Sequence, residues 1–296
     1  MIKLRHIFLL GLVLTICYGC PSETQVADPY DHAGQAVIDK DSINKFLLNH
    51  YFDDTVDSIK PLVAGKQPLS QDSRLIPQNI TENDIDYVMY HLVIEQGTPV
   101  PDKPFPTEMD SVLSKYQVWY FQNPDSLKLS QTGGDATWFS LGPSNLGGVI
   151  RGWSYGFPFF KGGENITNNG PIDYTNTGKG ILIIPSGLAY RETGRGAIPP
   201  NAQLLFYINM FDHIVGTDHD NDGLASSLEI EDSSVQDDPR LVDTDGDIIP
   251  NYLDNDDDND GVLTKDEDTN GDGDPRNDFS DPNNPTLPDY LNPDIK

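Results

Sequence analysis

The chain has 296 residues, enough for one large domain or two small ones, and its formal net charge is −28. The acidic residues are unevenly placed, because residues 217–296 hold 25 of the 47 Asp and Glu residues and only four Lys or Arg residues. A protein that binds nucleic acid needs a basic surface, so no nucleic-acid partner is expected. A long acidic run can be a solvated tail. The spacing of its acids distinguishes such a tail from a segment that binds metal.

Residues 1–19 have the features of a secretory signal peptide. Two basic residues precede an apolar stretch at 7–16, which suits a signal peptide and is too short to span a bilayer. A Gly directly before Cys20 resembles the lipobox of bacterial lipoproteins, so we expect cleavage before Cys20 and a lipid on its thiol. A plain signal peptide is the alternative. Cys17 and Cys20 are the only cysteines, so a chain cleaved there has no internal disulfide.

Residues 20–84 are predicted to form a tether and a small helical extension. From Asp41 onward, apolar residues recur at helical spacing, and Asp41 or Ser42 could cap this helix. The residues in this pattern are Ile43, Phe46, Leu47 and Tyr51. Residues 53–84 have a mixed composition with three prolines, and they are expected to be loop-like.

Residues 85–214 alternate β-rich segments with turns rich in Gly and Pro. A short helical segment is expected to begin at Val149, and residues 163–178 form a Gly- and Asn-rich insertion. The predicted strands are 86–95, 111–121, 138–141, 180–185 and 202–211. This pattern predicts an α+β domain with a mostly antiparallel sheet and one short helix.

Two strings in this domain carry a family resemblance. VIRGW at residues 149–153 and IPPNA at residues 198–202 have the order and spacing found in the FKBP family of peptidyl-prolyl cis-trans isomerases. The resemblance covers about residues 86–213, and the chain as a whole resembles the lipid-anchored FKBP-like proteins of Bacteroidota. It implies a twisted antiparallel sheet around a short helix, with an apolar pocket between them.

The resemblance also implies how such a pocket would work. Rotation about an X-Pro bond is slow because amide resonance gives a barrier of about 18–20 kcal/mol. An apolar pocket favours the twisted amide, which is less polar than the planar one, so no nucleophile or general acid is required. Two groups would orient the substrate, the backbone N–H of Ile150 and the hydroxyl of Tyr190. The implied pocket residues are Tyr116, Val149, Ile150, Trp153, Tyr190, Ile198 and Phe206.

The rim opposite the helix departs from the family pattern. Residues 126–130 stand where the family has a Phe-Asp pair, and residues 143–148 are additional. A domain that holds a proline-containing or apolar segment without catalysis is therefore an alternative to an active isomerase.

The acids of residues 217–296 are spaced as in calcium-binding loops. Such a loop places carboxylates at positions 1, 3 and 5, usually a Gly at position 6, and an acid at position 12. Ile248 stands at the glycine position of the second loop. The predicted ligands are Asp218, Asp220, Asp222 and Glu229 in the first loop; Asp243, Asp245, Asp247 and Asp254 in the second; Asp256, Asp258, Asp260 and Glu267 in the third; and Asp268, Asn270 and Asp272 in the fourth.

These loops follow one another too closely for paired EF-hands, which need an incoming helix before each loop. The string at residues 249–261 resembles thrombospondin type 3 repeats, and residues 287–291 echo residues 249–253. We therefore expect a tail with little regular structure, in which several structural calcium ions replace an apolar core. A solubilising acidic tail is the alternative.

Together these features predict a peptidyl-prolyl cis-trans isomerase and folding factor for exported or outer-membrane proteins. The expected location is the outer membrane, on its periplasmic or cell-surface face, through a lipid on Cys20. The expected partners are proline-containing polypeptides or subunits of an envelope complex. One alternative is a catalytically silent FKBP-like interaction subunit of an outer-membrane secretion, assembly or uptake complex. Another is a calcium-dependent adhesin.

Overall fold

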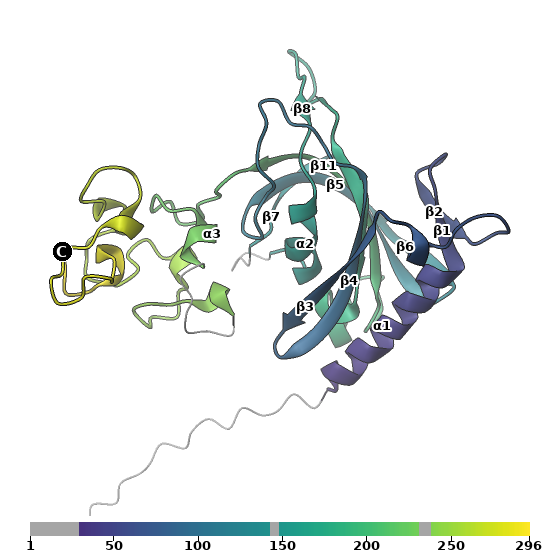
Figure 1. Ribbon diagram of the computed structural model, residues 1–296, viewed down its shortest axis with the longest axis horizontal. Coiled ribbons are helices and arrows are strands. Elements are labelled where there is room, and N and C mark those ends of the chain that lie inside the picture. The colour runs from purple at the N-terminus through teal and green to yellow at the C-terminus, as the bar shows by residue number, and fades with distance from the viewer. Residues whose placement is uncertain (1–29, 143–147, 231–237) are drawn as a thin grey trace, which may run out of the picture. The chain divides into compact units, whose positions relative to one another are not determined.

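A seven-stranded antiparallel sheet organises the computed structural model, which describes residues 30–142, 148–230 and 238–296 (Figure 1). The predicted signal peptide and Cys20 lie outside the described residues. Residues 32–296 form one unit. Within the described residues, no helix has both the length and the apolar character needed to cross a membrane.

The sheet has the strand order β3-β4-β10-β11-β5-β6, and β7 pairs with the same strand β5 as β6 does. All of its strand pairs are antiparallel. The strands are β3 (Leu75–Glu82), β4 (Ile85–Glu95), β5 (Ser111–Asn123), β6 (Ser126–Thr132), β7 (Thr137–Ser140), β10 (Gly178–Ile184) and β11 (Leu204–Ile214). This mixed architecture with a curled antiparallel sheet and few helices confirms the predicted α+β class.

The centre of the sheet is buried on both faces. Side chains alternate between faces along a strand, so Ile181 and Ile183 of β10 point to one face and Leu182 to the other. The strand pairing keeps these faces distinct, since Ile183 lies opposite Leu205, and Leu182 lies opposite Phe206. The sheet therefore separates two apolar clusters, one against each covering helix.

The concave face of the sheet is covered by α2 (Arg151–Gly156), which continues into the 3-10 turn η2 (Phe157–Phe159) (Figure 1). Glycines let this helix lie directly on β10. A Cβ atom on Gly152 would stand 2.4 Å from Cγ2 of Ile184, and one on Gly156 would stand 2.6 Å from Cδ1 of Leu182. The close approach buries Trp153 against the sheet.

The other face of the sheet is covered by α1 (His32–Asn49), through Ile43, Phe46 and Leu47 (Figure 1). The helix begins at His32 and not near Asp41, so the predicted start was wrong. Its first half is held partly by a buried carboxylate. Asp39 is fully buried and accepts hydrogen bonds from the backbone N–H of Ser186 and the amide of Gln203. An apolar pattern cannot reveal such a contact.

Residues 53–84 contain strands where a loop was predicted. The short strands β1 (His50–Asp53) and β2 (Ser58–Pro61) form a hairpin, which donates a hydrogen bond from the Ile59 N–H to the Tyr207 hydroxyl. Strand β3 is an edge of the main sheet, so the sheet begins at Leu75, before the predicted domain start at residue 85. Most of β3 is not buried and it contains Pro77, which an edge strand tolerates. It therefore lacks the alternating apolar pattern of a typical strand.

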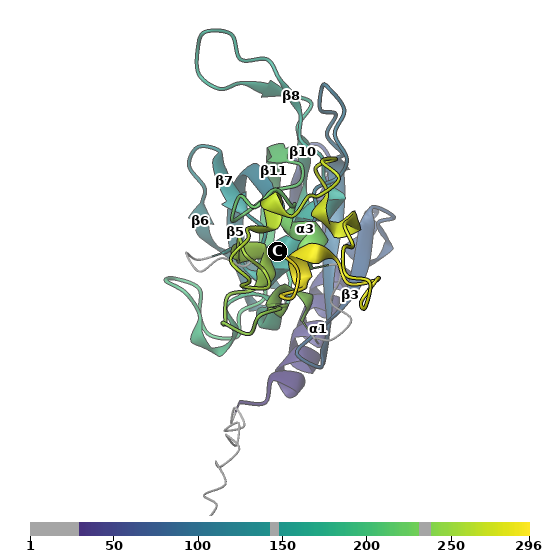
Figure 2. The same ribbon diagram turned by 90° about the vertical axis from the view of Figure 1, so that its left-hand side faces the viewer.

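The remaining elements are short. The predicted insertion contains a hairpin of β8 (Glu164–Asn165) and β9 (Tyr174–Thr175), which extends away from the sheet (Figures 1 and 2). The described part of residues 217–296 contains no strand and one short helix, α3 (Ser226–Glu229). The other 3-10 turns are η1 (Leu69–Gln71), η3 (Ser186–Leu188), η4 (Arg191–Thr193), η5 (Pro239–Leu241), η6 (Asn251–Leu253), η7 (Thr264–Asp266), η8 (Pro275–Asn277) and η9 (Asp289–Leu291).

Candidate functional site

The concave face of the sheet holds a cavity of about 720 Å³ beside α2. Its walls come from β5, β7, β11, the start of α2 and the loop at residues 190–198. Every residue of the predicted pocket lines this cavity, although these residues are far apart in the sequence. They are Tyr116, Val149, Ile150, Trp153, Tyr190, Ile198 and Phe206.

Aromatic rings form the floor of the cavity. Trp153 is 3% exposed, and its ring centre lies 5.0 Å from that of Tyr116 and 5.4 Å from that of Phe206, both edge-to-face. Phe139 completes the set, 5.1 Å from Trp153. Edge-to-face contacts of this kind are favourable and fix the ring orientations. The floor is therefore a rigid apolar surface that exists before any ligand arrives.

Tyr190 brings a polar group to the cavity wall. Burial raises the pKa of Tyr190, so its hydroxyl stays protonated and can donate a hydrogen bond. The guanidinium of Arg195 lies 5.6 Å from the centre of the Tyr190 ring. The turn between them needs Gly194, which has φ 64° and whose Cβ would stand 2.6 Å from the carbonyl oxygen of Ile198. This turn brings Tyr190 and Ile198 to the same wall.

Sequence reasoning missed several residues of the cavity. Phe139 lies in the predicted strand 138–141, but nothing in the sequence showed that it faces Trp153. The altered rim is formed by Ser130 and Gln131 of β6, together with Trp138 of β7. The cavity persists with this rim, while residues 143–147 lie outside the described residues. The other missed lining residues are Val118, Ser140, Gly148, Arg195, Gly196 and Ala197.

The acidic tail joins the sheet beside this cavity. The backbone N–H of Thr217 donates to Asp110, and the backbone N–H of Ser111 donates to the Thr217 hydroxyl. Two residues later, Nε2 of His219 is 2.8 Å from the hydroxyl of Ser140, which lines the cavity. The first residues of the tail are thus bonded to β5 and β7, which form part of the cavity wall.

A buried ion pair makes a second junction. Glu82 accepts hydrogen bonds from Nε of Arg151 at 3.1 Å, from the hydroxyl of Tyr155 at 2.6 Å and from Nη2 of Arg240 at 3.0 Å. Arg151 and Tyr155 belong to α2, whereas Arg240 belongs to the tail. Both Glu82 and Arg240 are buried. Glu82 is thus shared between Arg151 of the cavity helix and Arg240 of the tail, and Arg240 also pairs with Asp238, so this network of charges holds the tail residue near the helix.

The four acidic loops share one hydrogen-bond pattern. In each loop, the side chain at position 1 accepts from the backbone N–H at position 6, and those at positions 3 and 5 accept from the N–H two residues further on. The position-6 bonds are Gly223 to Asp218 (3.1 Å), Ile248 to Asp243 (2.9 Å), Gly261 to Asp256 (3.2 Å) and Gly273 to Asp268 (2.7 Å). One oxygen of each side chain is thereby tied to its own loop.

In the first and third loops, most of the acids keep a second oxygen that accepts no hydrogen bond, although both oxygens of Asp218 are bonded. Buried oxygens without a hydrogen-bond donor occur on Asp220, Asp222, Glu229, Asp256, Asp258, Asp260 and Glu267. Burial and neighbouring carboxylates raise the pKa of Glu229 to about 10 and that of Glu267 to about 8. Oxygen atoms that converge in this way fit a hard cation such as Ca²⁺.

The predicted ligands converge unequally. Three groups each place one ligand atom per residue within 4.8 Å of one another: Asp218 with Asp220 and Asp222, Asp243 with Asp245 and Asp247, and Asp256 with Asp258 and Asp260. In the described residues, the position-12 acids of the second and third loops, Asp254 and Glu267, join no such group. In the fourth loop, the amide of Asn277 donates to the second oxygen of Asp272.

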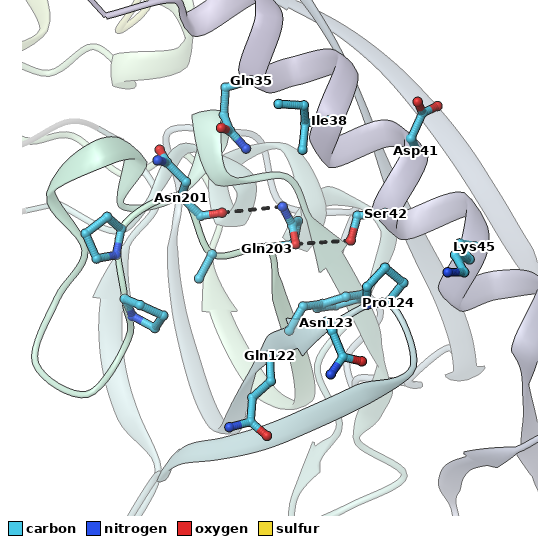
Figure 3. Close-up of a pocket in the computed structure, with 14 residues that line it drawn as sticks. Gln35, Ile38, Asp41, Ser42, Lys45, Gln122, Asn123, Pro124, Asn201 and Gln203 are labelled. Carbon is cyan, nitrogen blue, oxygen red and sulfur yellow. Dashed lines mark hydrogen bonds between the residues drawn. The ribbon is translucent and has the colours of Figure 1, made fainter.

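A second cavity, of about 540 Å³, lies between α1, the end of β5 with Pro124, and the loop at 199–203 (Figure 3). Gln203 crosses it, accepting a hydrogen bond from Ser42 and donating one to the carbonyl of Asn201, both at 3.4 Å. Because these polar groups bond to one another, they help to hold α1 on the sheet. None of the predicted site residues lines this cavity.

Comparison with known proteins identifies the domain around the first cavity. The family model described as FKBP-type peptidyl-prolyl cis-trans isomerase matches residues 102–211. Similar solved structures include FkpA from Escherichia coli, with 24% identity, 50% of this chain and 55% of that chain covered and a TM-score of 0.34. A peptidyl-prolyl cis-trans isomerase from Pseudomonas syringae pv. tomato has 22% identity, coverage of 47% and 82%, and a TM-score of 0.31. The N-terminal domain of FKBP42 from Arabidopsis thaliana has 14% identity, coverage of 47% and 92%, and a TM-score of 0.33.

A search of curated proteins finds no match. The chain spans 55% of the length of FkpA, so its similarity to that protein concerns a part of each chain. The match to residues 102–211 includes the strand that carries Tyr116, the helix that carries Trp153 and the wall formed by Tyr190, Ile198 and Phe206. The chain therefore contains an FKBP-type peptidyl-prolyl cis-trans isomerase domain.

Proposed function

We propose that this chain isomerises X-Pro bonds in exported or outer-membrane polypeptides. The observation that carries the proposal is that the predicted pocket residues line one apolar cavity with buried Trp153 at its floor. A proline ring packed on these aromatic side chains would bury apolar surface of the ring and of the cavity floor. The surrounding amide would lose water, which favours its twisted form over the more polar planar form.

Polar groups at the cavity wall would set the orientation of the substrate. The neutral hydroxyl of Tyr190 is available as a donor to a substrate carbonyl. Ile150 has an extended backbone and is the N-cap residue of α2, and its carbonyl accepts from the N–H of Trp153 at 2.8 Å. Its own N–H is the second candidate donor. Differential binding of the twisted amide is sufficient for catalysis, since no covalent step occurs.

Substitutions on the two faces of the sheet test this activity in the full chain. Trp153→Leu should lower kcat/KM about 10–100-fold by loss of apolar contact, and Tyr190→Phe about 2–10-fold by loss of one hydrogen bond. Trp119→Phe and Tyr207→Phe change the same residue types on the opposite face and should keep wild-type activity. A protease-coupled assay on a prolyl peptide measures all four. A wild-type chain that binds such a peptide without accelerating its isomerisation would favour the silent interaction subunit.

We also propose that the chain is exported and anchored in the outer membrane through a lipid on Cys20. Support comes from the two basic residues, the apolar stretch at 7–16 and the Gly before Cys20. The anchor would hold the isomerase domain near polypeptides that cross or enter the membrane.

Labelling with palmitate in a bacterial host that processes lipoproteins tests the anchor. Cys20→Ala should abolish the label, whereas Cys17→Ala should retain it because Cys17 would be removed with the signal peptide. Labelled protein is read on a gel after extraction. Persistent label in Cys20→Ala would refute this anchor.

We further propose that residues 217–296 bind several structural calcium ions. The partnerless buried oxygens in the first and third loops support this, because burying carboxylates without a counter-charge is costly. Bound Ca²⁺ would neutralise them, with the position-1, -3 and -5 side chains as ligands. Folding of the tail and binding of metal would then be coupled. The ions would order the tail, which has only a small apolar core of its own.

Calcium titration of the chelator-treated chain tests this coupling. The far-ultraviolet circular dichroism spectrum should change with added calcium and then saturate. At about 100 times the dissociation constant, the bound state should be stabilised by about 2.7 kcal/mol per ion, which raises the midpoint of thermal unfolding. A spectrum that stays unchanged up to millimolar calcium would favour a solubilising acidic tail. Magnesium, which demands a smaller octahedral site, serves as the matched control ion.

Ile248 offers a further test of the shared loop geometry. It stands where the other loops have Gly, it has φ 85° and it is 90% exposed. A left-handed conformation costs a non-Gly residue about 1–2 kcal/mol, and more for a β-branched one. Ile248→Gly should therefore raise the free energy of unfolding of the tail by about 1 kcal/mol at fixed calcium. Ile248→Ala keeps a Cβ atom, so its free energy of unfolding should rise by less. Thermal unfolding of the two variants measures the difference, and equal midpoints would contradict the strain argument.

A further inference from the structure

A group of three buried carboxylates joins two loops that are separate in the sequence. Asp222 and Glu229 belong to the first loop, whereas Asp257 belongs to the third. Each offers an oxygen within 4.8 Å of the others, and their exposed fractions are 0%, 3% and 2%. The spacing pattern assigned no ligand role to Asp257, because position 2 of such a loop normally points away from the bound ion of its own loop.

The oxygens in this group have no hydrogen-bond donor. Oδ2 of Asp222, both carboxylate oxygens of Glu229 and Oδ1 of Asp257 are buried and without a partner. The other oxygen of each Asp is fixed: the backbone N–H of Leu224 donates to Oδ1 of Asp222 at 2.8 Å, and the hydroxyl of Thr264 donates to Oδ2 of Asp257 at 2.9 Å. The free oxygens are therefore held toward one another by contacts within each loop.

The third loop differs from the others at this position. In the first loop, position 2 is His219, whose ring contacts the Ser226 hydroxyl at position 9, as Asp257 contacts Thr264. Position 2 of the second and fourth loops is Thr. Asp257 is thus the one acidic residue at position 2 among the four loops, and it lies beside two acids of the first loop.

The packing around the group brings the two loops together. A Cβ atom on Gly223 of the first loop would stand 3.5 Å from Cβ of Lys265 in the third loop. The buried Tyr252 of the second loop packs its ring edge-on to that of His219 at 5.9 Å. Three carboxylates held together away from water repel one another unless a cation or protons compensate them.

We propose that Asp222, Glu229 and Asp257 hold one divalent cation, of the calcium class, between the first and third loops. The proposal rests on the proposed calcium binding of the tail and adds a ligand that the loop pattern does not contain. An ion held in this way links the chain at residues 218–229 to the chain at residues 256–267. The first loop then has its full set of ligands only when the third loop is folded against it.

Calorimetric titration of the full, calcium-free chain with calcium chloride tests the proposal. Asp257→Asn keeps the shape of the side chain and removes its charge, and it should remove one ion from the stoichiometry or weaken one site at least tenfold. Asp266→Asn is the matched control, because Asp266 is an exposed acid of the same loop; it should bind calcium within twofold of wild type. If Asp257→Asn does not fold, Asp257→Glu keeps the charge but moves the oxygens, and it should fold and weaken the same site.

Glu229→Gln should weaken that same site, and the double variant should lose no more than the more affected single variant, because both residues would serve one ion. Additive losses would overturn the shared site. Wild-type binding together with an unaltered Asp257→Asn titration would overturn the shared site while leaving calcium binding by the tail intact. A wild-type chain that binds no calcium would overturn both proposals.

Discussion

The direct packing of α2 on β10 is the contact on which the cavity depends. The helix is six residues long, so it has little stability of its own and must gain it from tertiary contacts. Gly152 and Gly156 supply this contact by removing the side chains that would meet Ile184 and Leu182. The helix packing directs Trp153 onto the concave face of the sheet. There, three aromatic rings from β5, β7 and β11 contact it edge-to-face.

The same sheet must also be covered on its other side, and this requirement explains α1. Ile181, Ile183 and Leu205 alternate with the residues of the cavity side, so a rigid cavity floor implies an equally apolar outer face. The helix α1 buries that face and is anchored by Asp39 as well as by apolar contacts. The N-terminal helix is thus part of the isomerase domain's structure, and the cavity depends on it indirectly.

The pocket residues could be predicted from the sequence because the family strings fix both their order and their spacing. What failed were features without a local signal. Strand β3 is largely exposed and contains Pro77, so only its pairing with β4 makes it a strand. Phe139 reaches Trp153 because β7 pairs with β5, a contact between distant residues that no periodicity encodes. Asp257 was missed because its neighbours lie in another loop.

The tail follows a different rule from the domain that it joins. In the sheet, apolar side chains fill the interior, whereas in the tail the buried groups include carboxylates with free oxygens. Carboxylates buried in this way repel one another unless their charge is compensated, which is the physical basis of the proposed calcium binding. Two of the tail's attachments to the domain are specific polar contacts, Ser140 with His219 and Glu82 with Arg240. Ser140 lines the cavity, and Glu82 of β3 also holds Arg151 of α2, so both contacts connect the tail to elements around the cavity.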